Sequence, residues 1–275
     1  MDDSTRRRFL KDVSLGAAAF SASAQGAQKD QMPGRPPSGD TQAQASLPAS
    51  VMAIAAHPGD AFFAMGLAVA RQVQLGAQGV FLSLSLGERG SARIAPAQYG
   101  PLQRQAAESA AHALGASAEF LAYADGEIPV SEEAKFAVCD LIRQYRPGII
   151  VTHWRGSWHK DHEACYQIVN DALFYAGLPA LDRKQAAHEV GRIFFADNWE
   201  DANSFVPDVY LDITSVFERW QQACAIFPMW RGENGFRYND YYGSLAVTRG
   251  CLSGCKYAVA LMSPPEQRTR RVKAL

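Results

Sequence analysis

Two short segments of the sequence combine histidine with aspartate at spacings that suit metal binding. The first segment is A-H-P-G-D-A over residues 56–61, which places His57 and Asp60 three residues apart. Imidazole nitrogens and carboxylate oxygens are ligands of Zn²⁺ and of other divalent ions. A simple turn explains the same segment equally well, with proline and glycine bending the chain and Asp60 capping a helix.

The second segment is H-K-D-H over residues 159–162. One histidine can bind a metal ion, and the Asp161 carboxylate can accept a hydrogen bond from a ligand imidazole and so fix its tautomer. A solvated loop with incidental charges is the alternative. Four of the chain's 6 histidines nevertheless lie in or beside the two segments, and this clustering favours one shared site: His57, His153, His159 and His162.

The surrounding sequence predicts the elements that must position these side chains. Continuous apolar runs are typical of buried strands and occur at residues 51–56, 79–86, 120–122 and 148–152. Helical spacing, with start and stop signals, follows at residues 60–75, 101–114, 131–145 and 161–176. Further strands are expected near 192–196 and 207–213, with a helix near 214–226.

This alternation of strands and helices predicts an α/β fold, with a mostly parallel sheet covered by helices on both faces. In such sheets, ligands bind beyond the carboxyl ends of the strands. The first histidine segment directly follows a predicted strand, and the second follows another through the polar residues 153–158, so we expect them to meet at one edge. The polar cluster at 197–201 also follows a strand and is expected to line the same cleft.

The composition excludes several classes of protein. A hydrophobic content of 48% argues against a disordered chain. The 27 basic and 28 acidic residues give a net charge of −1, and the body of the chain has no basic run, which argues against nucleic-acid binding. No stretch of about 20 apolar residues is present, so a permanent membrane anchor is not expected.

The first residues differ from the rest. Residues 5–11 are T-R-R-R-F-L-K, and a short Ala- and Gly-rich run ends in A-S-A at 22–24. Residues 1–24 therefore resemble a twin-arginine export signal, which implies a periplasmic or otherwise extracytoplasmic protein. A basic tail on a cytosolic protein is the alternative. Residues 25–49 have the composition of a flexible linker, which leaves 50–275 as the folded domain.

The two histidine segments resemble those of the PIG-L / LmbE-like zinc N-deacetylases. That family carries A-H-P-D-D-E after its first strand and H-x-D-H after a later one. An L-G-E segment at 86–88 and Arg104, which lies before A-L-G at 113–115, match further family features. The resemblance extends from about Val51 to Met262 and implies a Rossmann-like sheet.

The family's residue roles transfer position by position. The resemblance implies that a zinc ion is held by His57, Asp60 and His162, with one coordination position left open, which is typical of a catalytic site. It further implies that His159 polarises the substrate carbonyl or protonates the leaving amine, and that Asp161 orients His159 or steadies the site. Arg104 matches a residue that contacts substrate in some members.

Aromatic residues flank the second histidine segment. Trp154 and Trp158 lie in the polar stretch that leads into this segment. Aromatic faces beside a polar cleft are suited to stacking against sugar rings. Packing in the core or within the loop is an equal alternative. If they do stack on sugars, the two tryptophans are substrate-binding residues.

One position departs from the family pattern. The first Asp of the family's H-P-D-D segment is the general base, and this chain has Gly59 there. Glu88, Asp161 and His159 are the candidates to replace it. We therefore expect a zinc-dependent amide hydrolase, acting with Zn²⁺ or another divalent metal on an N-acetylated amino sugar or glycoconjugate. The alternative is a non-catalytic sugar- or metal-binding module on the same fold.

Overall fold

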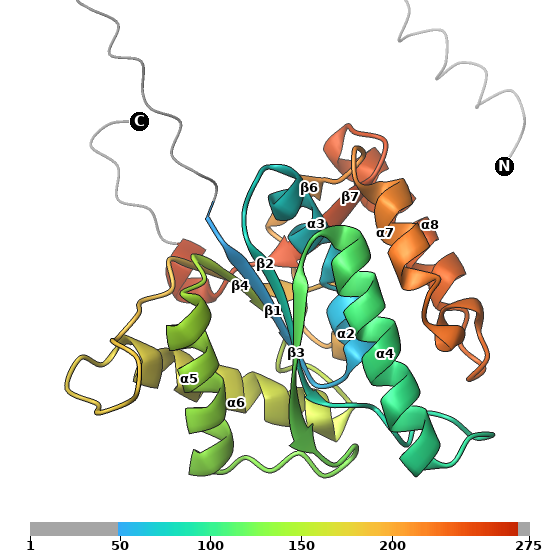
Figure 1. Ribbon diagram of the computed structural model, residues 1–275. Coiled ribbons are helices and arrows are strands. Elements are labelled where there is room, and N and C mark those ends of the chain that lie inside the picture. The colour runs from blue at the N-terminus through green and yellow to red at the C-terminus, as the bar shows by residue number, and fades with distance from the viewer. Residues whose placement is uncertain (1–48, 269–275) are drawn as a thin grey trace, which may run out of the picture. The chain divides into compact units, whose positions relative to one another are not determined.

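The computed structural model describes residues 49–268, which form a seven-stranded sheet with helices on both faces (Figure 1). The export signal expected over residues 1–24 lies outside these residues, as does the linker expected over 25–49 apart from Ala49. No helix in the described part of the chain is both long and apolar enough to cross a membrane.

The sheet is mostly parallel, as the alternation of elements predicted. Its strand order is β3-β2-β1-β4-β5-β7-β6; β1 to β5 run parallel, and β7 runs antiparallel to both β5 and β6. The strands are β1 (Val51–Ala55), β2 (Gly79–Ser85), β3 (Ser117–Tyr123), β4 (Ile149–Thr152), β5 (Arg192–Ala196), β6 (Val209–Asp212) and β7 (Ala258–Met262).

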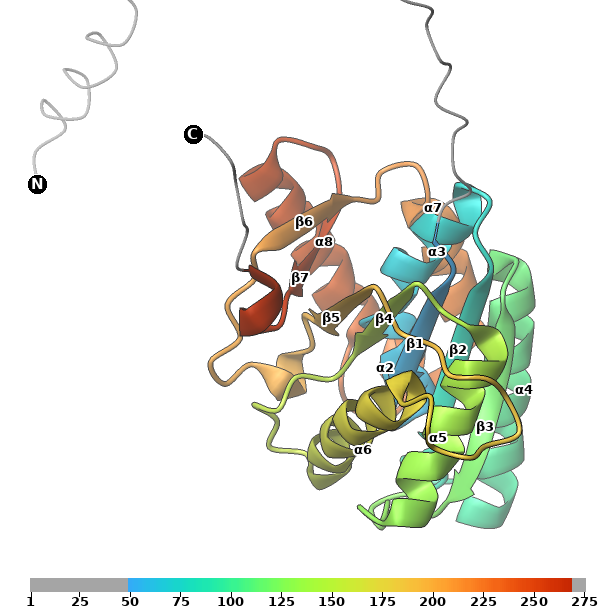
Figure 2. The ribbon, with the colours of Figure 1, turned by 90° about the vertical axis from the view of Figure 1, so that its left-hand side faces the viewer.

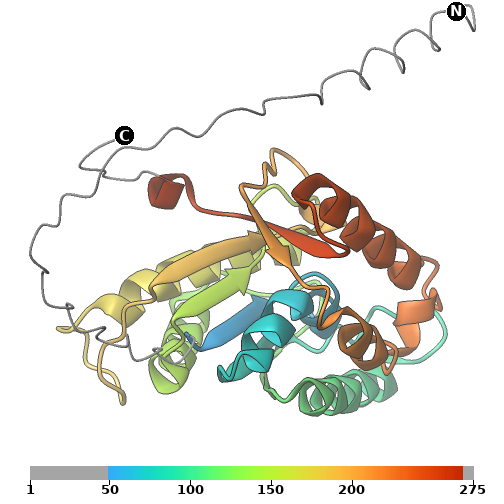
Figure 3. The ribbon, with the colours of Figure 1, turned by 90° about the horizontal axis from the view of Figure 1, so that it is seen from above.

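Two layers of helices enclose the sheet (Figures 2 and 3). One layer contains α5 (Glu132–Tyr145) and α6 (Lys160–Gly177), and the other contains α2 (Pro58–Phe63), α3 (Gly66–Gln74), α4 (Pro96–Leu114), α7 (Phe217–Cys224) and α8 (Tyr238–Ser253). Successive side chains of a strand point to opposite faces. Met52 therefore packs with the α5–α6 layer, and Ala53 packs with the other layer.

Two helix boundaries differ from the prediction. The helix expected over 60–75 is two helices, because the Trp220 indole donates to the Phe62 carbonyl at 2.7 Å. A continuous helix would use that carbonyl to accept from Gly66. The helix expected from 101 begins at Pro96, because proline fits the first helical position without loss of a hydrogen bond. The sequence analysis also missed α8 and β7.

The chain reverses direction across the sheet between β1 and β4. From β1 it runs outward to β2 and β3, then crosses over to β4 on the other side of β1. Val51 pairs with both Gly79 and Ile149, so the central strands begin level with one another and end at one edge. A crevice outside such a reversal is the usual ligand site of an open α/β sheet.

Candidate metal centre

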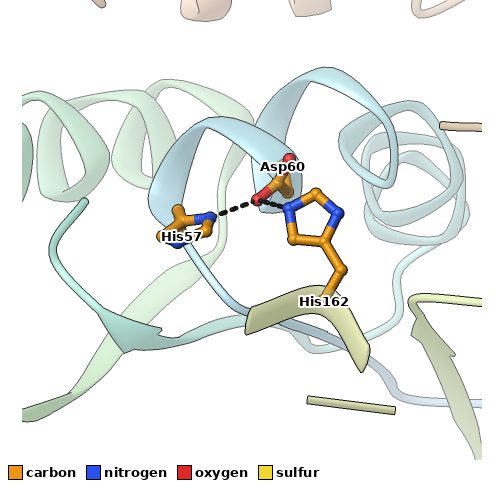
Figure 4. A group of neighbouring side chains, drawn as sticks. All are labelled: His57, Asp60 and His162. Carbon is orange, nitrogen blue, oxygen red and sulfur yellow. Dashed lines mark hydrogen bonds and ion pairs between the residues drawn. The ribbon is translucent and has the colours of Figure 1, made fainter. Parts of the chain in front are cut away.

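Three side chains from this edge converge on one point (Figure 4). His57 follows β1 and precedes α2, Asp60 lies in the first turn of α2, and His162 lies in the first turn of α6. Asp60 Oδ2 is 2.9 Å from His57 Nδ1 and 3.1 Å from His162 Nε2. The structure thus brings together the three residues that the sequence predicts as metal ligands.

The outer nitrogen of His57 is held by two carboxylates. His57 Nε2 is 3.1 Å from Asp125 Oδ1, just after β3, and 3.4 Å from Asp161 Oδ2. Carboxylates face both ring nitrogens and can only accept; once Asp60 binds a metal ion, the proton of the neutral ring is kept on Nε2 by Asp125 and Asp161. Nδ1 is then left with its lone pair directed toward Asp60, which is the arrangement of a metal ligand with an outer carboxylate partner.

His162 is arranged in the same way. Its Nδ1 is 2.8 Å from Asp201 Oδ1, and both residues are fully buried. Nε2 is buried and has no aligned hydrogen-bond partner, although Asp60 Oδ2 is close to it. A buried polar atom without a partner is costly. A divalent cation bound by both imidazoles and the carboxylate would satisfy it, so these residues fit a metal ion and leave one position open.

The charges of the metal-free site predict that metal binding releases protons. Burial alone would lower the pKa of His162, but the Asp60 and Asp201 carboxylates outweigh burial and raise it to about 10. Burial would also lower the pKa of His57, but the carboxylates of Asp125, Asp161 and Asp60 outweigh burial and raise this pKa. Both rings are therefore protonated at pH 7 without metal, and binding one ion should release about two protons.

Calorimetric metal titrations in buffers of different ionisation enthalpy measure this release directly. Because metal and protons compete for the same histidine nitrogens, the apparent metal affinity should rise as the pH increases from 6 to 8. Affinity that is independent of pH, with no proton release, would show that the metal does not displace protons from these two histidines.

A cavity of about 130 Å³ opens beside the three residues. Its described lining includes His57, Gly59, His159 and Glu200, and it contains no lysine or arginine. His159 Nδ1 accepts a hydrogen bond from the Asp161 backbone N–H at 3.2 Å, which leaves the ring proton on Nε2. Burial and the neighbouring His162 and His57 lower the pKa of His159 to about 4, so the ring is a neutral hydrogen-bond donor.

Two of the predicted base candidates are engaged in structural contacts. Glu88 accepts a hydrogen bond from the Asp125 backbone N–H at 2.8 Å and is absent from the described cavity lining. Asp161 Oδ2 accepts from the Gly126 backbone N–H at 2.6 Å and contacts His57. The Asp161 carboxylate therefore contacts His57, which fits the second of the two implied roles, steadying the site, better than orienting His159.

The predicted substrate-binding residues fall in different places. Arg104 is on the exposed side of α4, where its guanidinium stacks on Phe120 at 4.3 Å, away from the cavity lining. Trp154 is 6% exposed and packs in the core, with its indole bonded to the Asn203 carbonyl. Only Trp158, which is 68% exposed, presents a free aromatic face near His159.

Three further carboxylates lie at the site. Glu200 and Asp201 belong to the polar cluster at 197–201 that was expected to line the cleft, whereas Asp125 was not predicted. Asp125 follows β3, and Glu200 and Asp201 lie in a short 3-10 turn, η1 (Trp199–Asp201), after β5. Glu200 Oε2 is 3.6 Å from His162 Nε2, and burial together with Asp60 raises the pKa of Glu200 to about 7. Each follows the carboxyl end of a parallel strand, and that position was the available signal.

The chain is similar to known proteins along most of its length. Residues 52–173 match the family model of PIG-L, GlcNAc-PI de-N-acetylase. The 4-oxalmesaconate hydratase of Pseudomonas putida is 25% identical over 210 residues, which are 73% of this chain and 80% of the relative. The diacetylchitobiose deacetylase of Thermococcus kodakarensis is 23% identical over 229 residues, which are 78% of this chain and 83% of the relative.

Solved structures share the fold. The 4-carboxy-2-hydroxymuconate hydratase of Pseudomonas putida superposes with a TM-score of 0.74 at 22% identity, covering 82% of this chain and 99% of that one. The N,N′-diacetylchitobiose deacetylase of Pyrococcus horikoshii superposes with a TM-score of 0.68 at 18% identity, covering 82% of this chain and 86% of that one. The PIG-L model covers both histidine segments, so the resemblance inferred from them is confirmed, and both of these relatives are enzymes.

Proposed function

We propose that this protein is a metal-dependent amide hydrolase that removes the acetyl group from an N-acetylated amino sugar. The observation that carries the proposal is the convergence of His57 Nδ1, Asp60 Oδ2 and the partnerless His162 Nε2 beside a small cavity. The PIG-L match and the deacetylase relative support an acetyl amide as the substrate group.

The residues around the cavity can each perform a different step of hydrolysis. A divalent ion held by His57, Asp60 and His162 would lower the pKa of a water molecule and polarise the amide carbonyl. Glu200, which lines the cavity 3.6 Å from His162, is placed to accept the proton of the attacking water at Oε2. His159 Nε2–H can donate a hydrogen bond to the oxygen that gains negative charge.

In this proposal Glu200 is the general base, a role that the family's aspartate has at the position of Gly59. Gly59 lines the same cavity but has no side chain that could accept a proton. Glu88 and Asp161 already accept backbone hydrogen bonds, as described above. Glu200 is therefore the carboxylate best placed to act as the base.

Hydration of a carbon–carbon double bond is the second candidate reaction. It is favoured by the similarity to the Pseudomonas putida hydratase, which extends over 80% of that relative. A polycarboxylate substrate, however, needs cationic partners for its carboxylates. The described cavity lining offers no lysine or arginine for this purpose, and the neutral amide of an N-acetyl group fits this lining better.

The size of the cavity limits how much of the substrate it encloses. At about 130 Å³ it is smaller than the pockets of roughly 300–1,000 Å³ that enclose whole ligands. The acetamido group can enter, and the sugar ring must then lie at the mouth. Trp158 and Trp199 directly precede the lining residues His159 and Glu200 and form an aromatic group with Phe236. The ring centroids of Trp199 and Phe236 are 4.4 Å apart, and those of Trp158 and Trp199 are 5.7 Å apart.

Trp158→Ala should raise KM with little change in kcat. An aromatic face contributes about 0.5–1.5 kcal/mol to stacking, so we expect a KM increase of roughly 2- to 10-fold. The indole is 68% exposed, so the thermal stability should stay close to that of the wild type. Trp158→Phe retains an aromatic face and is the matched control. An unchanged KM for the alanine variant would exclude Trp158 from substrate binding.

Acetate release from a panel of N-acetylated sugars and glycan fragments tests the proposed reaction. The zinc-loaded protein is compared with a His57→Ala/His162→Ala double variant as the blank. In H₂¹⁸O, hydrolysis places ¹⁸O in acetate, whereas hydration of an unsaturated acid places it in the main product. Sugar binding without turnover would instead support the non-catalytic binding module.

A further inference from the structure

We propose that Asp201 is a positioning residue that accepts hydrogen bonds from two histidines at once, fixes the tautomer of His162 and thereby keeps it ready to bind the metal. This inference rests on the proposed metal site and is independent of the substrate. Asp201 lies outside both histidine segments, in the turn that follows β5.

The two carboxylate oxygens of Asp201 have separate partners. Oδ1 is 2.8 Å from His162 Nδ1, and Oδ2 is 2.7 Å from His153 Nδ1. Asp201, His153 and His162 are each 0% exposed. The two imidazole rings stack with their centroids 4.0 Å apart and are both joined to Asp201. The carboxylate therefore forms the centre of a fully buried polar network.

The backbone determines which nitrogen of His153 carries the proton. The Ala56 N–H donates to His153 Nε2 at 3.1 Å, so Nε2 must be the unprotonated nitrogen of the neutral ring. The proton then lies on Nδ1 and is donated to Asp201 Oδ2. Ala56 directly precedes the ligand His57, so this chain of hydrogen bonds links the segment that carries His57 to the other predicted ligand, His162.

A carboxylate is required because two N–H groups point at the same residue. His153 must donate from Nδ1, and His162 must also donate from Nδ1 if its Nε2 is to bind a metal ion. Only a carboxylate offers two acceptors in this position. An asparagine would offer one acceptor and one donor, and its amide group would force one histidine to place its proton on the other nitrogen.

The same three residues do not form a second metal site. His153, His162 and Asp201 are close enough to hold an ion. However, His153 cannot offer a lone pair at Nδ1, because the Ala56 N–H already occupies the lone pair on Nε2. Metal ligands must present unprotonated nitrogens. The remaining group of possible ligands, His57, His159 and Asp161, shares His57 with the proposed site. One ion per chain is therefore expected, at the Asp60 side of His162.

The test compares metal binding by wild-type protein, Asp201→Asn and Asp197→Asn. Because His153 is fixed by the backbone, the asparagine NH₂ should face His162 Nδ1 and shift the His162 proton to Nε2. The metal dissociation constant of Asp201→Asn should rise by about 10- to 100-fold, as is typical for outer partners of metal ligands. Asp197 is four residues away and pairs with Arg249 at 2.7 Å, so its substitution should leave metal affinity unchanged.

Nitrogen NMR of the histidine rings provides a readout that does not depend on activity or on the variant's folding. In the zinc-loaded wild type, His162 and His153 should both carry a proton on Nδ1. A proton on His162 Nε2, two bound ions per chain, or unchanged metal affinity in a folded Asp201→Asn protein would each overturn the proposal. Failure of the wild type to bind any metal would instead refute the proposed function.

Discussion

His162→Ala should abolish metal binding at the site. The substitution removes one of three ligands and leaves Asp60 and His57 alone with the ion. Loss of an outer partner already weakens metal affinity by about 10- to 100-fold, so loss of a ligand itself should exceed about 100-fold. Activity should fall to that of the metal-free protein. Metal analysis after dialysis and acetate release measure the two effects.

His112→Ala is the matched control, because His112 is exposed on α4. Zinc should stabilise the wild type and this control against thermal unfolding, since a ligand that binds only the folded state raises its stability. The same zinc concentration should leave the unfolding temperature of His162→Ala unchanged. A His162→Ala protein with full metal content and full activity would show that His162 is not a ligand.

Glu200→Gln should lower kcat strongly while the metal remains bound. Glutamine keeps the size of the side chain but cannot accept a proton from water, and a positioned base contributes about 10²- to 10⁴-fold in rate. Because the cavity and the three ligands are unaltered, KM and metal content should change little. Steady-state kinetics with metal analysis of the same sample measures both. Glu218→Gln, an identical change on the exposed side of α7, should have no effect.

A second substitution tests whether Glu200 replaces the family's base at position 59. A Cβ at Gly59 would meet Phe63 at 3.4 Å and Met229 at 3.5 Å, which are ordinary contacts, so an aspartate has room to begin there. Gly59→Asp should therefore restore part of the rate lost in Glu200→Gln. If Glu200→Gln keeps the kcat of the wild type, Glu200 is not the base. If Glu200→Gln loses its metal ion, Glu200 is a metal ligand and not the base.

The fold was predictable because strand burial has a direct sequence signal. The apolar runs that became β1, β2 and β4 are buried, and each is short and bounded by helical spacing. β7 is equally apolar but follows a long helix with weak amphipathic character, and the antiparallel pairing of β7 depends on its contacts with β5 and β6. The break between α2 and α3 depends on Trp220, which is far away in the sequence.

The site was predictable where residues of suitable type cluster in the sequence. His57, Asp60, His159 and His162 were found because they form two local motifs. Asp201 was expected at the cleft only as part of the polar cluster at 197–201, without its histidine partners. Asp125 was missed because it is a single carboxylate after β3, and only the parallel sheet brings it to a histidine. Trp154 and Trp158 are alike in sequence, and only the packing around each shows which one is buried.

The most direct test of the account is to add zinc to metal-free protein and follow acetate release from an N-acetylated amino sugar. We predict that activity rises in proportion to the metal and reaches its plateau at one ion per chain, because three ligands with an open position form one catalytic site. The His57→Ala/His162→Ala variant should stay inactive throughout. Full activity of the metal-free protein, or equal activity in the double variant, would contradict the account.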